Sequence, residues 1–188
     1  MSEQVLSLPW TAAAGLSRRR AAGSLSSAIV LGNAGVIVWL WIHGGNWTLA
    51  SYGDRFAEGK LDLIPDEHWR FLEEFCIDWY EIDSHFFVHA NVDPDLPLEE
   101  QPLYLLHWEP LFETRPHFSG KVMVCGHTKQ RSGLPRNLGH AVCLDTWVYG
   151  DGWLTCLDVM TGQFWQANRH GEFRTSWLGE PEEGEELA

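Results

Sequence analysis

Short apolar runs alternate with polar stretches and with turns rich in glycine and proline along most of this chain. Two uninterrupted runs, residues 86–88 and 122–125, have the pattern of strands that are covered on both faces. Residues 141–144, 153–159 and 163–167 are further strand candidates, separated by Asp-Gly and Thr-Gly turns. We expect the last two of these strands to form a hairpin.

Apolar side chains at helical spacing predict a helix over residues 65–80. Pro65 and two acidic residues open this segment, as is typical of a first helical turn. The apolar positions that follow are Trp69, Leu72, Phe75 or Cys76, and Trp79. We expect the helix to pack this aromatic face on the core, and we expect residues 98–111 to form a helical connection. Helices mixed with buried strands indicate an α/β sheet domain.

Each of the two uninterrupted apolar runs is followed by a histidine, His89 after the first and His127 after the second. In layered α/β folds ligands bind at the carboxyl ends of strands, so two imidazoles that emerge there are expected to meet. Neutral imidazole suits first-row metals such as manganese, iron, zinc and nickel. This placement indicates a shared metal site; the alternative is two ordinary histidines satisfied by hydrogen bonds.

The residues around both histidines resemble sequence elements of one enzyme family, the serine/threonine phosphoprotein phosphatases, which are calcineurin-like metallophosphoesterases. Residues 87–94 (FVHANVDP) resemble the family's HAGxxP element, and residues 124–128 (VCGHT) resemble its GHT element. The resemblance covers about residues 39–171 in the family's order. The other matching positions are His43-Gly44-Gly45, Thr48-Leu49, Ser51-Tyr52-Gly53, Gln101, Trp108, Leu144-Asp145-Thr146 and residues 154–157.

The resemblance implies a partial metallophosphoesterase-type β-sandwich flanked by helices, with the activity of a metal-dependent phosphoester hydrolase. It implies that His89 and His127 bind a divalent metal, manganese first and iron, zinc or nickel otherwise, and that the substrate is a phosphoprotein or a small phosphoester. Asp145 is expected to accept a hydrogen bond from a ligand histidine, or else to cap a turn. Arg115 is the candidate phosphate-binding arginine; its alternative role is a solvated loop charge.

The family's first metal-binding elements do not occur in this sequence. The GDxHG and GDxxDRG loops are absent, and the GNHE element is reduced to Gly32-Asn33-Ala34-Gly35. Asn33 is a further candidate ligand, although its position 11 residues before Gly44 also suits an accidental match. Two imidazoles are fewer than the three protein ligands usual in a catalytic site. We therefore expect an incomplete metal site and impaired activity, and the catalytic residues stay unassigned.

Three hypotheses follow, in this order. The first is a member of this phosphatase family that is truncated, or read in a shifted frame, near its start. The second is a noncatalytic relative that acts as a binding or regulatory module. The third is a hydrolase similar to the symmetric dinucleoside tetraphosphatases, which share the elements that contain His89 and His127.

Charge and cysteine content narrow the functional classes. The formal net charge of -13 disfavours nucleic acid as a partner, because phosphate backbones require a basic surface. The four cysteines form no CxxC pair, which favours a reducing, cytoplasmic location.

Composition divides the chain into three parts. Residues 1–38 are expected to be an irregular or non-homologous leader, residues 39–175 the metallophosphoesterase-like domain, and residues 176–188 an acidic tail. Residues 21–42 carry no charge and follow three arginines, so a membrane anchor is the alternative for that segment. Serine, glycine and asparagine dilute its apolar character, which makes a membrane partner the less favoured interpretation.

Overall fold

A computed structural model describes residues 18–20, 45–54, 60–112 and 114–179. The helices are α3 (Gly45–Ser51), α4 (Asp66–Glu74) and α5 (Leu103–Trp108), with short 3-10 turns η1 (Leu61–Leu63) and η2 (Leu98–Glu100). The strands are β1 (Arg18–Arg20), β2 (Ile77–Glu81), β3 (His85–Val88), β4 (Val122–Cys125), β5 (Arg136–Asn137), β6 (Ala141–Cys143), β7 (Leu154–Leu157), β8 (Gln163–Ala167) and β9 (Phe173–Trp177).

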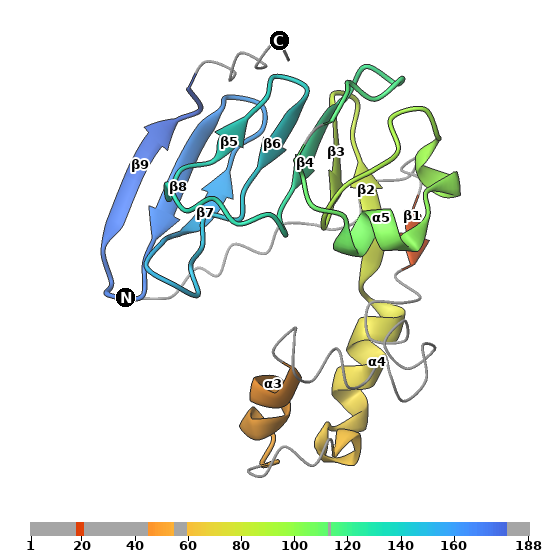
Figure 1. Ribbon diagram of the computed structural model, residues 1–188, viewed down its shortest axis with the longest axis vertical. Helices are drawn as coiled ribbons and strands as arrows, with labels where there is room; N and C mark the ends of the chain where they lie inside the picture. Colours follow the sequence, from red (N-terminus) through yellow and green to blue (C-terminus); the bar gives the residue numbers. More distant parts are fainter. Residues whose placement is uncertain (1–17, 21–44, 55–59, 113, 180–188) are drawn as a thin grey trace, which may run out of the picture.

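The strands form two sheets, so the described chain is mixed α/β as expected (Figure 1). The larger sheet has the order β1-β2-β3-β4-β6-β5, and its strands β3, β4 and β6 run parallel to one another. The smaller sheet has the order β7-β8-β9 and is antiparallel. The strands predicted at residues 86–88, 122–125 and 141–144 are confirmed, and so is the hairpin, which is formed by β7 and β8.

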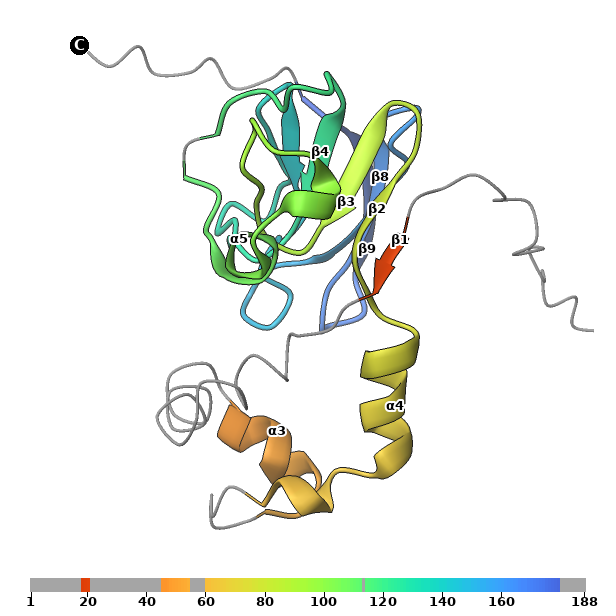
Figure 2. The same ribbon diagram turned by 90° about the vertical axis from the view of Figure 1, so that its right-hand side faces the viewer.

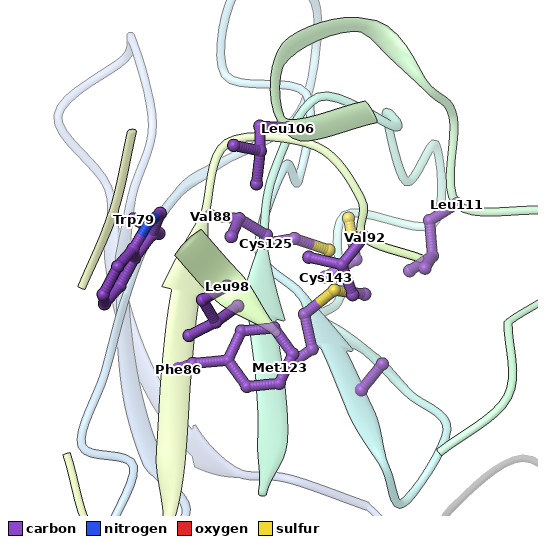
Figure 3. Packing of buried hydrophobic residues seen from close by; sticks show 11 residues of the cluster. Trp79, Phe86, Val88, Val92, Leu98, Leu106, Leu111, Met123, Cys125 and Cys143 are labelled. Atoms are coloured by element: carbon purple, nitrogen blue, oxygen red, sulfur yellow. The ribbon is translucent and has the colours of Figure 1, made fainter. Parts of the chain in front are cut away.

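The core of the larger sheet lies between its central strands and the connection that carries α5 (Figure 3). Its buried side chains are Trp79, Phe86, Val88, Met123, Cys125, Ala141 and Cys143 from the strands, and Val92, Leu98, Leu106 and Leu111 from the connection. A fully buried aliphatic or Phe side chain stabilises a fold by roughly 1.5–3 kcal/mol. This packing holds α5 close to the carboxyl ends of the parallel strands.

The helix predicted over residues 65–80 is wrong at its C-terminal end. Helix α4 ends at Glu74, and Ile77–Glu81 is strand β2. This strand pairs with β1 on one side and β3 on the other, so sheet hydrogen bonds outweigh the local helical pattern. Trp79 is only 2 % exposed, but it packs in the core from this strand and not from a helix.

Helices α3 and α4 form a small unit at one end of the molecule, below both sheets in Figures 1 and 2. Leu49 and Ile64 are its buried residues, and Trp69 packs partly against them. Phe71 and Phe75 stack on each other with ring centroids 6.1 Å apart, yet Phe75 is 70 % exposed. The expected packing of the aromatic face on the core is therefore wrong for Phe75.

The connection predicted as helical over residues 98–111 contains two short helices, η2 and α5, instead of one continuous helix. Pro102 stands between them as the N-cap of α5, since proline has no N–H for a preceding turn. Strand β9 was not anticipated from the sequence, because Phe173–Trp177 alternates weakly and four of its five residues are exposed.

Several expectations fall outside the described residues, namely Asn33, the uncharged segment 21–42 and the tail beyond residue 179. Residues 18–20, within the expected irregular leader, form strand β1 and pair antiparallel with β2. Among the helices that the structure describes, none combines the length and apolar character needed to cross a membrane.

Candidate functional site

Three polar side chains follow the carboxyl ends of three neighbouring parallel strands. His89 follows β3, His127 follows β4 after one glycine, and Asp145 comes two residues after β6. The parallel pairing continues past the strands, because Gly126 N–H donates to the His89 carbonyl at 2.9 Å and Leu144 N–H donates to the Cys125 carbonyl at 2.7 Å. This edge of an open α/β sheet is where ligands commonly bind.

The rings of His89 and His127 meet at this edge. Nε2 of His89 lies 3.2 Å from Nδ1 of His127, and the ring centroids are 5.1 Å apart at an interplanar angle of 66°. Solvent reaches His89, whereas His127 is half-buried. The structure thus brings together the two imidazoles that the sequence singled out.

The orientation of His127 is set by the end of α5. Its Nε2 lies 3.1 Å from the carbonyl oxygen of Trp108, and the two rings meet edge to face at 88°. Because a carbonyl only accepts, we assign the proton to Nε2, which leaves a lone pair on Nδ1 facing His89. The backbone of His127 has φ 59°, a left-handed conformation that is unusual for a side chain with a Cβ.

The end of α5 is itself tied to the strand ends. Ala90 N–H donates to the Leu106 carbonyl at 2.8 Å, and Leu111 N–H donates to Oγ1 of Thr128 at 2.7 Å. The second of these bonds links the segment after α5 to the residue directly after His127. The Trp108 carbonyl therefore has a fixed position relative to both histidines.

The surroundings of His89 favour its neutral form. Although solvent reaches part of the ring, partial burial lowers the pKa of His89, the neighbouring imidazoles of His127 and His107 lower it further, and the carboxylate of Asp145 partly offsets them. A neutral ring keeps a lone pair, which metal binding requires.

His107 and Asp78 form a buried pair that the sequence interpretation missed. Nε2 of His107 lies 3.2 Å from Oδ1 of Asp78, and the two side chains are 7 % and 1 % exposed. His107 is on α5 and Asp78 on β2, so the pair joins the helix to the sheet. Both residues sit within patterns that predicted other roles, and no local sequence signal marks their contact.

Asp145 caps the turn that follows it, which is one of its two expected roles. Its Oδ1 accepts a hydrogen bond from Trp147 N–H at 3.2 Å, and its carbonyl oxygen accepts one from Gln130 N–H at 2.7 Å. Asp145 thereby connects the loop after β6 with the loop after β4. Its carboxylate acts on His89 in the direction that raises the pKa of that ring, against the larger effect of burial.

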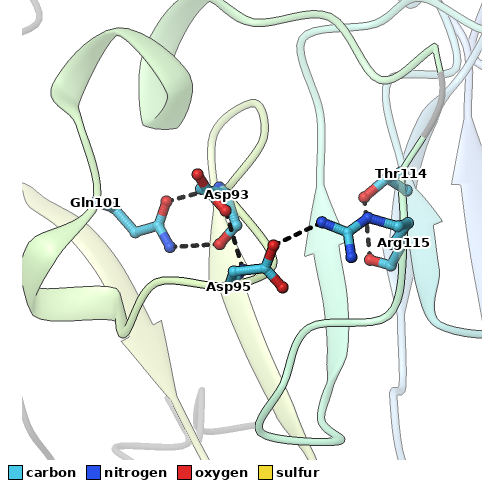
Figure 4. A network of polar contacts seen from close by, with 5 residues as sticks. All are labelled: Asp93, Asp95, Gln101, Thr114 and Arg115. Atoms are coloured by element: carbon cyan, nitrogen blue, oxygen red, sulfur yellow. Dashed lines mark hydrogen bonds and ion pairs between the residues drawn. The ribbon is translucent and has the colours of Figure 1, made fainter.

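Arg115 lies on the surface in a pair with Asp95 (Figure 4). Its Nη2 is 2.7 Å from Oδ2 of Asp95, and the side chains are 69 % and 68 % exposed. Neighbouring Asp93 is held by Gln101, which accepts from its N–H at 2.7 Å and donates to its carbonyl at 2.8 Å. In this arrangement Arg115 already has an anionic partner.

The two histidines fit one edge of a metal site. Two ligand nitrogens bound to one ion at about 2.0–2.1 Å are separated by about 3–3.4 Å, which matches the observed 3.2 Å between the facing atoms. Within the described part of the chain, no set of three His, Cys, Asp or Glu side chains is arranged to hold a metal. The donor set seen is therefore two imidazoles, and Asn33 lies outside the described residues.

Comparisons with known proteins do not assign this chain to a family: no family model, no curated protein and no solved structure matches it.

Proposed function

We propose that this chain binds one divalent transition-metal ion through Nε2 of His89 and Nδ1 of His127, manganese first among the candidates. We further propose that it is a metal-dependent phosphoester hydrolase of the serine/threonine phosphatase type, with a partial metallophosphoesterase β-sandwich and impaired activity. The observation that carries this proposal is the 3.2 Å approach of the two ring nitrogens at the carboxyl ends of β3 and β4.

Metal binding requires only a change of tautomer in His89. In the metal-free pair, His127 donates through Nε2 to Trp108, so His89 donates through Nε2 to Nδ1 of His127. When His89 instead carries its proton on Nδ1, both facing nitrogens present lone pairs to one position. A bound divalent ion supplies Lewis-acid polarisation of a phosphoryl oxygen there. The residues of the chain hold and orient it, with His127 fixed by the Trp108 carbonyl.

Weak catalysis follows from the number of ligands. Catalytic zinc sites usually have three protein ligands, and two neutral imidazoles supply no charge to offset that of the ion. We therefore expect little hydrolysis of p-nitrophenyl phosphate with added manganese. A fast, metal-dependent rate would show that further ligands complete the centre.

Calorimetric titration with manganese and with nickel tests metal binding independently of turnover. His89→Ala and His127→Ala should each weaken binding by more than about tenfold, since each removes one of two ligands. His170→Ala is the matched control, because His170 is exposed in the turn between β8 and β9. Equal affinities across all three variants would place the metal elsewhere or nowhere.

Nitrogen NMR separates metal binding from simple hydrogen bonding between the rings. Zinc is used here because it is diamagnetic. When zinc is added, His89 should change from the Nε2–H to the Nδ1–H tautomer, while His127 keeps its proton on Nε2. Unchanged tautomers during the titration would favour two histidines satisfied by their mutual hydrogen bond.

Metal binding without any turnover would favour the noncatalytic relative over the hydrolase. The observation that favours this second candidate is that the donor set within the described residues consists of two imidazoles only, fewer than a catalytic site usually has. The phosphatase assay alone distinguishes the hydrolase from the noncatalytic relative, because both candidates require the same metal affinity.

A further inference from the structure

The loop that follows His127 carries two basic residues, Lys129 and Arg131, and both are exposed. The N–H of Gln130, between them, donates to the carbonyl of Asp145 at 2.7 Å. The Gln130 side chain also donates to the carbonyl of Thr128 at 2.6 Å. These bonds hold the two basic residues beside the strand ends where the histidines lie.

Arg131 is positioned over a tryptophan ring. Its guanidinium carbon lies 5.7 Å from the centre of Trp147, within the range of a cation–π contact. Trp147 is itself fixed, because its carbonyl accepts from Gly150 N–H at 3.0 Å and from Gly152 N–H at 3.1 Å. A Cβ at Gly150 would collide with the Trp147 ring, so the indole lies tightly against that backbone. The guanidinium therefore has a rigid support.

Two strained residues bracket this arrangement. Among the described residues, the non-glycine residues with left-handed φ are His127 at 59° and Trp147 at 64°. One precedes the basic loop and the other supports its arginine. Such backbone outliers persist where the surrounding structure holds them and concentrate at ligand sites.

Three cations of the described chain have carboxylate partners. Arg115 pairs with Asp95, Lys121 with Glu81 and Arg169 with Asp151, at 2.6–2.7 Å. Within the same described part, Lys129 and Arg131 form no ion pair, although the chain has 26 acidic residues. Two neighbouring cations without an internal anion, in a chain of net charge -13, point to an anion from outside.

Tyr149 lies within electrostatic range of Arg131 and Asp145. Its side chain is on the surface, with the residue 67 % exposed. Burial and the charge of Asp145 raise the pKa of Tyr149, and the charge of Arg131 lowers it in part.

We propose that Arg131 and Lys129 form a binding site for a phosphate dianion, either inorganic phosphate or the phosphoryl group of a phosphate monoester. Arginine offers a planar fork that matches two phosphate oxygens, and lysine adds a point charge. The identification of this anion as part of a substrate rests on the proposed function, whereas anion binding rests on the loop itself. Arg131, and not Arg115, is then the arginine that contacts the phosphoryl group.

Titration of inorganic phosphate and of phenyl phosphate in the presence of EDTA tests this site without any metal. Arg131→Met should weaken phosphate binding by about tenfold, because it removes charge-assisted hydrogen bonds. Lys129→Met should weaken it by a smaller factor. Arg169→Met is the matched control, since Arg169 is an exposed arginine paired with Asp151 at 2.6 Å. It should bind phosphate as the wild type does.

Binding that is equal in the wild type and in Arg131→Met overturns the proposal, as does a wild type that binds neither compound. Equal weakening in Arg131→Met and Arg169→Met overturns it too, because the effect is then one of net charge. If inorganic phosphate and phenyl phosphate bind with equal affinity, the phosphate dianion alone is the ligand. If phenyl phosphate binds more tightly, the ligand is a phosphate monoester.

The metal-site proposal and the phosphate-site proposal can be tested independently of each other. His89→Ala should bind phosphate normally in EDTA, since that experiment depends on the loop alone. With added manganese the wild type should bind phosphate more tightly, and His89→Ala should not. If manganese does not tighten phosphate binding in the wild type, while binding in EDTA is intact, the metal site is contradicted and the phosphate site stands.

Discussion

Nε2 of His107 lies 3.2 Å from Oδ1 of Asp78 in the interior between α5 and β2. Within the described residues, both oxygens of Asp78 and Nδ1 of His107 have no hydrogen-bond partner, so the pair depends on its mutual attraction. Burying either the Asp78 carboxylate or the His107 imidazole without a partner would lower the stability of the fold. The contact also supports the candidate site, because α5 carries the Trp108 carbonyl that orients His127.

Replacement of Asp78 by alanine should lower the free energy of unfolding by about 1–3 kcal/mol, because it leaves the polar ring of His107 buried without its partner. Urea denaturation measures this change. Asp95→Ala is the matched control: it removes a carboxylate from an ion pair that is 68–69 % exposed, and it should cost less than about 1 kcal/mol. Similar costs for the two variants would show that the buried pair contributes no more than a surface pair.

The lowered pKa of His89 predicts a pH dependence of stability. Partial burial, and then the neighbouring imidazoles of His127 and His107, keep this ring neutral at a pH where the unfolded chain takes up a proton, near pH 6.5. Between the folded and unfolded pKa values the unfolded chain binds more protons. Stability from this group is therefore lost as pH falls through 6.5, and the loss is complete below the folded-state pKa.

His89→Asn should remove this dependence. On acidification from pH 7.5 to pH 5, roughly one unit or more on either side of the histidine reference value, the wild type should lose more unfolding free energy than His89→Asn. His170→Asn serves as the control and should follow the wild type. Parallel pH profiles for the wild type and His89→Asn would contradict a lowered pKa at His89.

Gly152 should not tolerate a side chain. A Cβ there would collide with the Thr146 carbonyl oxygen and lie 2.8 Å from the Trp147 carbonyl oxygen, both of which are backbone atoms. Gly152→Ala should therefore cost about 1–3 kcal/mol or more of unfolding free energy. It should also disturb the turn that supports Trp147.

Gly179→Ala is the comparison for Gly152→Ala, because a Cβ at Gly179 meets nothing within 4 Å. Its stability should stay within about 0.5 kcal/mol of the wild type. Thermal unfolding of the two variants checks the difference, and an unchanged Gly152→Ala would mean that this turn can move.

The four cysteines should react with a thiol reagent in two classes. Cys125 and Cys143 are buried on neighbouring strands, whereas Cys156 is exposed and Cys76 is half-buried. The hydrogen bond to Cys143 and burial both raise the pKa of Cys125, which further slows its reaction. In the native protein Cys156 should therefore react first and Cys76 next. Cys125 and Cys143 should react only after unfolding in urea. Four fast thiols in the native protein would contradict this core.

The sequence pattern alone determined the central strands and the position of the two histidines after them. Short continuous apolar runs at residues 86–88 and 122–125 favour buried strands over helices because of their length. A residue that directly follows a strand lies at the carboxyl end of that strand. Neighbouring parallel strands then bring such residues together. The sequence thus predicted that His89 and His127 meet, and the parallel pairing of β3 with β4 in the structure confirms it.

Only the tertiary structure decided the contacts that join distant segments. Residues 77–81 fit a helical pattern, and pairing with β1 and β3 made them a strand. The Asp78–His107 pair, the Trp108 carbonyl at His127 and the support of Arg131 by Trp147 have no sequence signature. Each depends on packing between elements, and local residue patterns report which face of an element is apolar but not which element covers it.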